Sequence, residues 1–157
     1  MEALNVRIAI VDDLADERSL LRNRLESALN RRSVQANFFE YENGEAFLSA
    51  AKDERFAAAF LDIYMPGING VETAKALRAF DPECLLVFTT TSTDHALEGF
   101  QVRAMHYLVK PFAAEDIERL TDEILARLPQ PDRYMEIKVN GGDVRLSYRN
   151  IVCAEHF

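Results

Sequence analysis

The amino-acid sequence predicts an α/β protein in which five parallel strands form one sheet with helices on both faces. Two observations predict this fold. Short apolar runs alternate regularly with longer segments whose apolar residues recur at helical spacing. The run FAAAFLDI at 56–63 is apolar without interruption up to its aspartate, as expected for a central strand that is covered on both sides. Such a strand–helix alternation predicts parallel strands joined by right-handed crossovers.

The first part of the chain supplies two strands and two helices. The run VRIAIV at 6–11 predicts a buried strand, and VQANFFEY at 34–41 predicts a second one. Between them, residues 14–30 carry leucine and alanine at helical spacing. Asn43 has a side chain suited to capping a helix N-terminus, so we expect a helix over 44–53.

The second part continues the same alternation. The central run and two further apolar runs predict three strands, at 56–63, 85–90 and 105–109. Each of these strands is followed by a segment with helical spacing, at 70–80, 93–102 and 113–128. These elements complete a first domain over residues 1–128.

The pattern changes after residue 128. Two prolines fall within three residues, which predicts a linker at 129–132. Residues 133–157 then contain two alternating runs on either side of NGGD, a hairpin turn signal. A few short strands cannot form a core of their own, so we interpret 133–157 as the truncated start of an all-β domain. The alternative is a β-appendage that is complete in itself.

Composition narrows the classes of function. The chain has 157 residues and a net charge of −8, which argues against binding of nucleic acid or anionic membranes by this chain itself. A basic module outside it is not excluded. Its two cysteines have no metal-ligand spacing, as in reduced cytosolic proteins. No apolar run reaches 18 residues and no signal pattern is present, so we expect a cytoplasmic protein without membrane contact.

Reactive side chains follow the predicted strands, at the edge where an open α/β sheet binds its ligands. Asp12 and Asp13 end the first strand, and Asp62 ends the central one. Three threonines, 89–91, end the fourth strand, and Lys110 ends the fifth. A single strand-terminal aspartate is often only a helix cap, but this coincidence predicts one shared crevice.

The electrostatics of that crevice indicate its ligand. Two carboxylates about 5 Å apart repel each other by roughly 3 kcal/mol at an effective dielectric constant of 20. Such a cluster needs a proton or a divalent cation, and a set of oxygen ligands open to solvent favours Mg²⁺ or Mn²⁺ over Zn²⁺. The metal would in turn attract a phosphoryl group, which Lys110 and a threonine hydroxyl could contact. Asp62, on the middle strand, is the candidate nucleophile that would form an acyl phosphate.

The residues that carry these features resemble a known family, the receiver domains of two-component response regulators. The resemblance covers about residues 5–128, and Asp62 follows Asp12 by 50 residues and precedes Lys110 by 48. It rests on four motifs: IVDD at 10–13, LDIYMPGINGVE at 61–72, FTT at 88–90 and YLVKPF at 107–112. It implies a flavodoxin-like sheet of strand order 2-1-3-4-5. The combined signal is specific, although DD or KP alone would mean nothing.

The resemblance extends to a subfamily, the LytTR-type (LytR/AlgR-like) regulators. The segment TDHALEGFQVRAMHYLVKPF at 93–112 is similar to receivers that are attached to a LytTR DNA-binding domain. The tail EIKVNGGDVRLSYRNIVCAEHF at 136–157 resembles the first strands of that domain. The resemblance implies a transcriptional regulator that contacts DNA only through the part missing here.

The resemblance also implies a role for each matching residue. Asp62 accepts the phosphoryl group from a sensor histidine kinase and is a direct Mg²⁺ ligand. Asp13 and the backbone carbonyl of Tyr64 are further direct ligands, whereas Asp12 acts mainly through water. Lys110 pairs with a phosphoryl oxygen, Thr90 hydrogen-bonds the phosphoryl group, the rotamer of Tyr107 follows Thr90, and the Lys110–Pro111 bond is cis. Three successive threonines leave the switch assignment open by one residue, and alignment through ALE at 96–98 favours Thr90.

Phosphorylation is expected to switch dimerisation or the output domain. The family's usual homodimer surface corresponds to helix 93–102, strand 105–109 and helix 113–128. Two residues depart from the family pattern: Thr91 stands where a smaller residue is usual, and Tyr64 places an aromatic ring beside the site. We expect Thr91 to slow phosphotransfer or hydrolysis and Tyr64 to shield the acyl phosphate from water.

Two other functions fit the fold less well. An aspartate-nucleophile phosphatase needs a second acid two residues after the nucleophile, and Tyr64 cannot serve as one. A receiver that works without phosphate would not need the full set of acids and Lys110. We therefore expect a non-enzymatic phosphoacceptor, whose only reactions are its own Mg²⁺-dependent phosphorylation and dephosphorylation.

Overall fold

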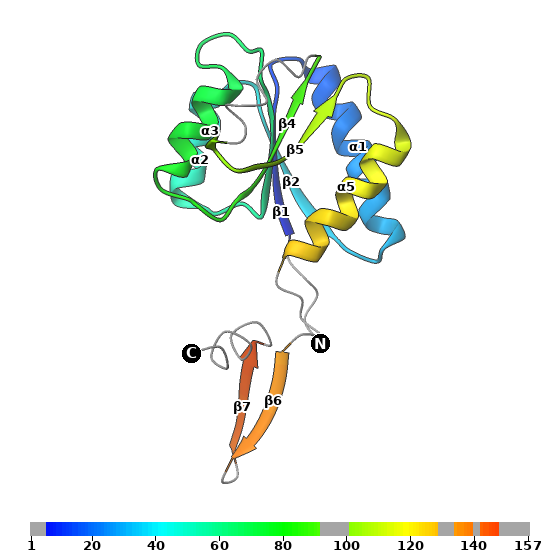
Figure 1. Ribbon diagram of the computed structural model, residues 1–157, viewed down its shortest axis with the longest axis vertical. Coiled ribbons are helices and arrows are strands. Elements are labelled where there is room, and N and C mark those ends of the chain that lie inside the picture. The colour runs from blue at the N-terminus through cyan, green and yellow to red at the C-terminus, as the bar shows by residue number, and fades with distance from the viewer. Residues whose placement is uncertain (1–5, 92–100, 129–133, 140–141, 148–157) are drawn as a thin grey trace.

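The computed structural model of the protein describes residues 6–91, 101–128, 134–139 and 142–147. A five-stranded parallel sheet of order β2-β1-β3-β4-β5 forms its centre (Figure 1). The strands are β1 (Val6–Val11), β2 (Ala36–Tyr41), β3 (Ala58–Asp62), β4 (Leu85–Thr90) and β5 (Ala104–Val109). The helices are α1 (Ala15–Arg31), α2 (Gly44–Asp53), α3 (Gly70–Arg78) and α5 (Ala114–Arg127). The predicted fold class and strand order are confirmed.

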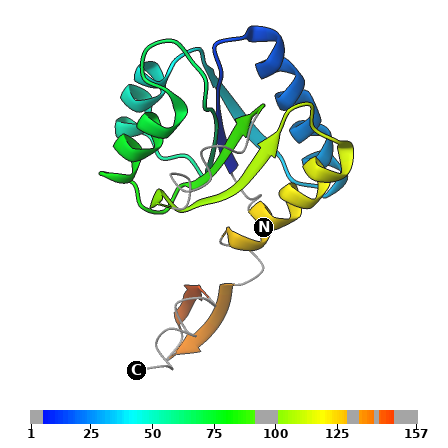
Figure 2. The same ribbon diagram turned by 45° about the horizontal axis from the view of Figure 1, so that its top comes forward.

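Two layers of helices cover the sheet. Helices α2 and α3 lie on one face and α1 and α5 on the other, as two views agree (Figures 1 and 2). Alternation along β3 sends Ala59 and Leu61 into the core under α2 and α3, and Phe60 into the core under α1 and α5. Every residue of β3 is buried, which confirms the interpretation of this run as a central strand.

Polar side chains cap two of the helices. The Asn43 side chain accepts a hydrogen bond of 2.7 Å from the Ala46 amide and starts α2, as predicted. Asn69 and Glu72 form a reciprocal capping box at the start of α3. This second cap places the N-terminus of α3 directly behind the loop that leaves β3.

Several boundaries differ from the sequence prediction by about two residues. The helix predicted over 70–80 ends at Arg78 and is followed by a tight turn. The turn precedes Pro82, and a proline disfavours helical geometry at the residue before it. The strand predicted over 34–41 begins at Ala36, after Ser33 adopts a φ of 58°. Nearly all of the helix predicted over 93–102, the linker 129–132 and the last ten residues, 148–157, lie outside the described residues.

Ion pairs join α1 to α5 on one face of the sheet. Arg32, just after α1, donates from Nε to Asp122 Oδ1 at 2.6 Å and from Nη1 to Glu118 Oε1 at 2.9 Å. Arg31 also pairs with Glu118. Because Arg32 contacts two acids on successive turns of α5, this group of four residues fixes the C-terminal end of α1 against the middle of α5.

Two further strands form a separate hairpin. Strands β6 (Tyr134–Val139) and β7 (Gly142–Ser147) pair in antiparallel fashion, with Ile137 opposite Val144. The hairpin predicted around NGGD is therefore confirmed. A two-stranded ribbon has little stability on its own, so it needs further strands or a packing surface.

Two glycines shape the loop between β3 and α3. Gly67 has a φ of +78°, a conformation that side chains with a Cβ rarely adopt. A Cβ on Gly70 would lie 2.4 Å from the Asp62 carbonyl oxygen and 2.8 Å from the Ile63 Cα. The first turn of α3 therefore packs directly on the backbone that carries Asp62, and only glycine fits there.

We expect Gly70→Ala to lower the free energy of unfolding by about 1–3 kcal/mol in urea titrations, because overpacking against backbone cannot be relieved by a rotamer change. The helix propensity of alanine alone would raise stability by about 1 kcal/mol, so the sign of the effect is decisive. Ala76→Ser, at an exposed position of the same helix, is the control. An unchanged or raised stability of Gly70→Ala would contradict the close backbone contact.

Candidate functional site

Three carboxylates meet at the carboxyl edge of the sheet. Val11 of β1 is in register with Leu61 of β3, so Asp12 and Asp62 leave adjacent strands at the same level. One carboxylate oxygen from each of Asp12, Asp13 and Asp62 lies within 4.8 Å of the others. Asp12 and Asp62 are only 4% and 6% exposed, whereas Asp13 reaches solvent. The predicted cluster of acids is thus brought together.

Hydrogen bonds from the start of α1 hold Asp12 in place. Its Oδ1 accepts from the Leu14 amide at 2.9 Å, and its backbone carbonyl accepts from Arg18 Nη1 at 2.6 Å. Arg18 is anchored in turn by Glu40 of β2, at 3.2 Å from its Nε. The sequence analysis did not single out Arg18, which positions the turn that carries the first two acids.

Lys110 reaches this cluster from the end of β5. Its backbone amide donates to the Thr90 carbonyl at 2.7 Å, and the following peptide bond to Pro111 is cis, as the family resemblance implies. Its Nζ lies 2.9 Å from Asp12 Oδ2, 3.8 Å from Asp62 Oδ2 and 4.0 Å from Glu17 Oε2. In this structure the lysine therefore hydrogen-bonds Asp12 rather than the predicted phosphoacceptor.

The protonation of Lys110 follows from these neighbours. Burial alone would lower the pKa of its amine, but the hydrogen bond to Asp12 and the charges of Asp62, Asp12 and Glu17 raise that pKa above its ordinary value. The lysine side chain is 13% exposed and carries a full positive charge at neutral pH. The Lys110 ammonium is thus the positive charge that pairs with the carboxylates of the site in this structure.

The surroundings of Asp62 favour its neutral form, whereas those of Lys110 favour the charged form. Burial, and after it the nearby charge of Asp12, raise the pKa of its carboxyl to about 6 in spite of the attraction of Lys110. The Tyr64 amide, 3.4 Å from Asp62 Oδ1, favours the ionised form only weakly. Desolvation and the expected charge repulsion thus both disfavour the ionised carboxylate of Asp62. The attraction of Lys110 and the hydrogen bond from the Tyr64 amide do not fully offset them.

The threonines at the end of β4 separate by face. Thr89 is in register with Asp62, and Thr90 follows it with no exposed surface. Alternation places Thr90 on the same face as Phe88, whose ring lies 5.4 Å from that of Tyr107. Thr90 and Tyr107 therefore share a face of the sheet, as the predicted switch pair requires. Thr91 is exposed.

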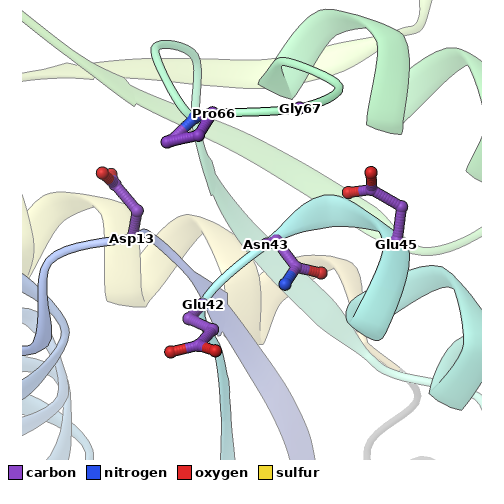
Figure 3. A pocket seen from close by; sticks show the side chains of 6 residues that line it. All are labelled: Asp13, Glu42, Asn43, Glu45, Pro66 and Gly67. Carbon is purple, nitrogen blue, oxygen red and sulfur yellow. The ribbon is translucent and has the colours of Figure 1, made fainter.

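An acidic groove of about 570 Å³ opens beside the cluster (Figure 3). Its lining comprises Asp13, Glu42, Asn43, Glu45, Pro66 and Gly67. Asp13 stands on one side of the groove, facing Pro66, while Glu42 comes from the connection between β2 and α2 and Glu45 from the first turn of α2. The groove opens onto the most exposed of the three acids, and its charge attracts cations.

Comparison with known proteins decides the family. Residues 8–122 match the family model described as the response regulator receiver domain. The chain belongs to this family. It is thus the receiver domain of a two-component response regulator, which agrees with the order of its strands and with the motifs that end them.

The curated relatives of this receiver include regulators of the LytT and LytR type. The sensory transduction protein LytT of Bacillus subtilis is 34% identical over 73% of this chain and 46% of its own length. LytT of Oceanobacillus iheyensis is 34% identical over 65% of this chain and 42% of its own length. The transcriptional regulatory protein LytR of Staphylococcus aureus is 26% identical over 81% of this chain. The chain spans about half the length of these relatives.

Solved receiver structures match the fold closely. The response regulator TrrA of Thermotoga maritima, described as a complex with Mg²⁺ and BeF, superposes with a TM-score of 0.65 at 26% identity and covers 76% of this chain and 98% of its own. The response regulatory domain of mrkE from Klebsiella pneumoniae gives a TM-score of 0.70 at 24% identity, covering 77% of this chain and 96% of its own. No helix in the described part of this receiver is long and apolar enough to cross a bilayer.

The donor set of this receiver suits a hard divalent cation. Three carboxylates supply oxygen ligands with no nitrogen or sulfur among them, and one of them is open to solvent. The net negative charge around Lys110 exceeds what one ammonium can balance, which also favours a dication. The acidic site is typical of Mg²⁺ binding.

The raised pKa of Asp62 makes stability depend on pH when divalent metal is absent. Its folded pKa of about 6 lies above the ordinary 3.8, so the folded protein gains stability below about pH 4 and loses it as pH rises through 6. We expect metal-free Asp62→Asn to be more stable than wild type by about 3 kcal/mol at pH 7, with the difference shrinking toward pH 4.

Urea unfolding in the presence of a chelator measures this difference, and Asp16→Asn, an exposed acid of α1, is the control for a simple loss of charge. The same variant should bind Mg²⁺ more weakly. Equal stability of wild type and Asp62→Asn at pH 7 would show that the cluster is not under electrostatic stress.

Proposed function

We propose that this receiver is the phosphorylation-controlled input of a LytTR-type transcriptional regulator, in which Asp62 accepts the phosphoryl group from a sensor histidine kinase. The observation that carries the proposal is the position of Asp62. It is a buried carboxylate at the end of the central strand, within reach of two further acids and 3.8 Å from a lysine nitrogen.

The residues present fit a role for Mg²⁺, with Mn²⁺ as a second suitable ion. Asp13, Asp62 and the Tyr64 backbone carbonyl would hold it directly, and Asp12 would act through water, since Asp12 already bonds Lys110. When bound, the ion neutralises carboxylate charge and phosphoryl oxygens, which lowers the cost of bringing an anion to an acidic site.

The transfer itself is a substitution at phosphorus. An oxygen of ionised Asp62 forms a bond to phosphorus while the bond from phosphorus to the kinase histidine nitrogen breaks, and that nitrogen keeps the bonding electron pair. Lys110 then pairs with a phosphoryl oxygen, and Thr90 donates its hydroxyl to another. Tyr107, on the face of Thr90, would follow this movement and change the adjoining surface.

The domain organisation is part of the same proposal. Residues 1–128 form the receiver, 129–132 the linker and 133–157 the start of the LytTR DNA-binding domain. The hairpin β6–β7 supports this division because it is a sheet of its own. DNA contact would come only from the remainder of that domain, and the site of action would be the cytoplasm.

Dimerisation is the proposed output. The surface would combine helix 93–102, strand 105–109 and helix 113–128, of which the structure describes β5 and α5. Val109, at the end of β5 beside Lys110, is 41% exposed despite its apolar side chain. Sedimentation of the phosphorylated protein can reveal whether this surface pairs two copies.

A phosphodonor experiment tests the function. With acetyl phosphate and Mg²⁺, we expect intact-mass spectrometry to show the addition of one phosphoryl group, because an activated carboxylate needs no kinase to react with a small acyl phosphate. Asp62→Asn should lose the addition, and chelation of Mg²⁺ should abolish it in wild type.

The exposed Asp16 again offers a matched control, since Asp16→Asn should react like wild type. Phosphorylation of Asp62→Asn at the wild-type rate would sink the proposed role of this residue. A wild-type protein that is never modified would favour the receiver that acts without phosphate.

Tyr64 is proposed to lengthen the life of the acyl phosphate. Its backbone amide contacts Asp62, and its side chain is 49% exposed at the mouth of the site. We expect Tyr64→Asn to accelerate autodephosphorylation severalfold, because the ring would no longer exclude water. Loss of the phosphoryl group after removal of the donor measures the rate, and an unchanged rate would refute the shielding role.

A further inference from the structure

Glu17 is a fourth carboxylate at the site, and the roles described above do not use it. It belongs to the first turn of α1, five residues after Asp12. Its Oε2 lies 4.0 Å from Lys110 Nζ, and its side chain is 34% exposed. Among the described residues, no other ion pair involves Glu17.

The surroundings of Lys110 make this contact consequential. One ammonium lies within 4.0 Å of three carboxylates, those of Asp12, Asp62 and Glu17. Asp12 and Asp62 have other partners in the proposed reaction, the metal and the phosphoryl group. Glu17 has neither, so its attraction for Lys110 persists when the phosphoryl group arrives.

We propose that Glu17 is a positioning residue that competes with the phosphoryl group for Lys110 and thereby disfavours the phosphorylated state. This inference rests on the proposed function of Asp62. The direction of the effect follows from charge, because a phosphoryl oxygen must draw the ammonium away from a carboxylate whose one ion pair within the described part of the chain is with Lys110. Removing the charge of Glu17 should release Lys110 toward the phosphoryl group.

Glu17 is not required to keep Lys110 charged. The hydrogen bond of 2.9 Å to Asp12 and the charge of Asp62 already stabilise the ammonium. Loss of Glu17 therefore leaves a charged lysine with one competitor fewer, rather than a neutral amine. Asp16 lies beside Glu17 in the same helical turn and is exposed, which makes it the matched control for helix-terminus and net-charge effects.

The test uses beryllofluoride with saturating Mg²⁺ as a phosphoryl mimic, because a Mg²⁺–BeF complex is the form in which the similar TrrA receiver was solved. Apparent affinity is measured by titration of wild type, Glu17→Gln, Glu17→Asp and Asp16→Asn. We expect Glu17→Gln to bind about threefold more tightly, the range of a partly exposed ion pair. Glu17→Asp, whose carboxylate is withdrawn from Lys110, should show most of this gain, and Asp16→Asn none.

A double-mutant cycle assigns the effect to the lysine. In a Lys110→Ala background, Glu17→Gln should no longer tighten binding. The proposal is overturned if Glu17→Gln binds no more tightly than wild type, or if Glu17→Asp behaves like wild type while Glu17→Gln gains. An equal gain with and without Lys110 also overturns it. If wild type does not bind beryllofluoride at all, the proposed function of Asp62 fails instead.

Discussion

The ion pair between Asp12 and Lys110 joins residues 98 positions apart and ties the end of β5 to the end of β1 across the carboxyl edge of the sheet. Strands β3 and β4 lie between β1 and β5 in the sheet, so Asp62, at the end of β3, lies between the two strands that this ion pair joins. The lysine compensates one carboxylate well and a second one poorly, which leaves Asp62 as the least satisfied charge of the cluster. A cation that binds beside such a carboxylate stabilises it, and a reaction that removes its charge removes the free-energy cost of burying that charge.

In the proposed reaction, the ion pair between Asp12 and Lys110 would link the site to the strands around it. A metal that engaged Asp12 would weaken the hold of its nearest partner on the lysine, and a phosphoryl group on Asp62 would offer that lysine a new partner. The backbone amide of Lys110 donates a hydrogen bond to the Thr90 carbonyl, which joins the ends of the two strands that carry the lysine and the threonine. A change of partner by the Lys110 ammonium would therefore act on β4 and β5, the strands that carry Thr90 and Tyr107.

The sequence was sufficient for the fold and for the acids of the site because both depend on local pattern. An uninterrupted apolar run that ends in Asp62 specifies a central strand and a residue at its edge, and the order of the strands brings Asp12, Asp13 and Lys110 to the same edge. Other features depend on three-dimensional distances. Nothing in the spacing reveals that Lys110 bonds Asp12 in preference to Asp62, or that Glu17 extends from a helix into the site. The helix end at Arg78 was also missed, since the effect of Pro82 reaches back through a turn rather than along the helical pattern.

The contacts of Arg31 and Arg32 with Glu118 and Asp122 have a consequence for how the molecule responds to its solvent. Helix α1 begins beside the acids and is joined near its C-terminal end to α5 by these ion pairs. The pairs therefore connect the reactive edge of the sheet with a helix of the surface proposed for dimerisation. These ion pairs are partly exposed, so added salt screens and weakens them. The apolar contacts beneath them are not weakened by screening, because they carry no charge. Rising ionic strength is therefore expected to weaken the link between α1 and α5 while the apolar core stays packed.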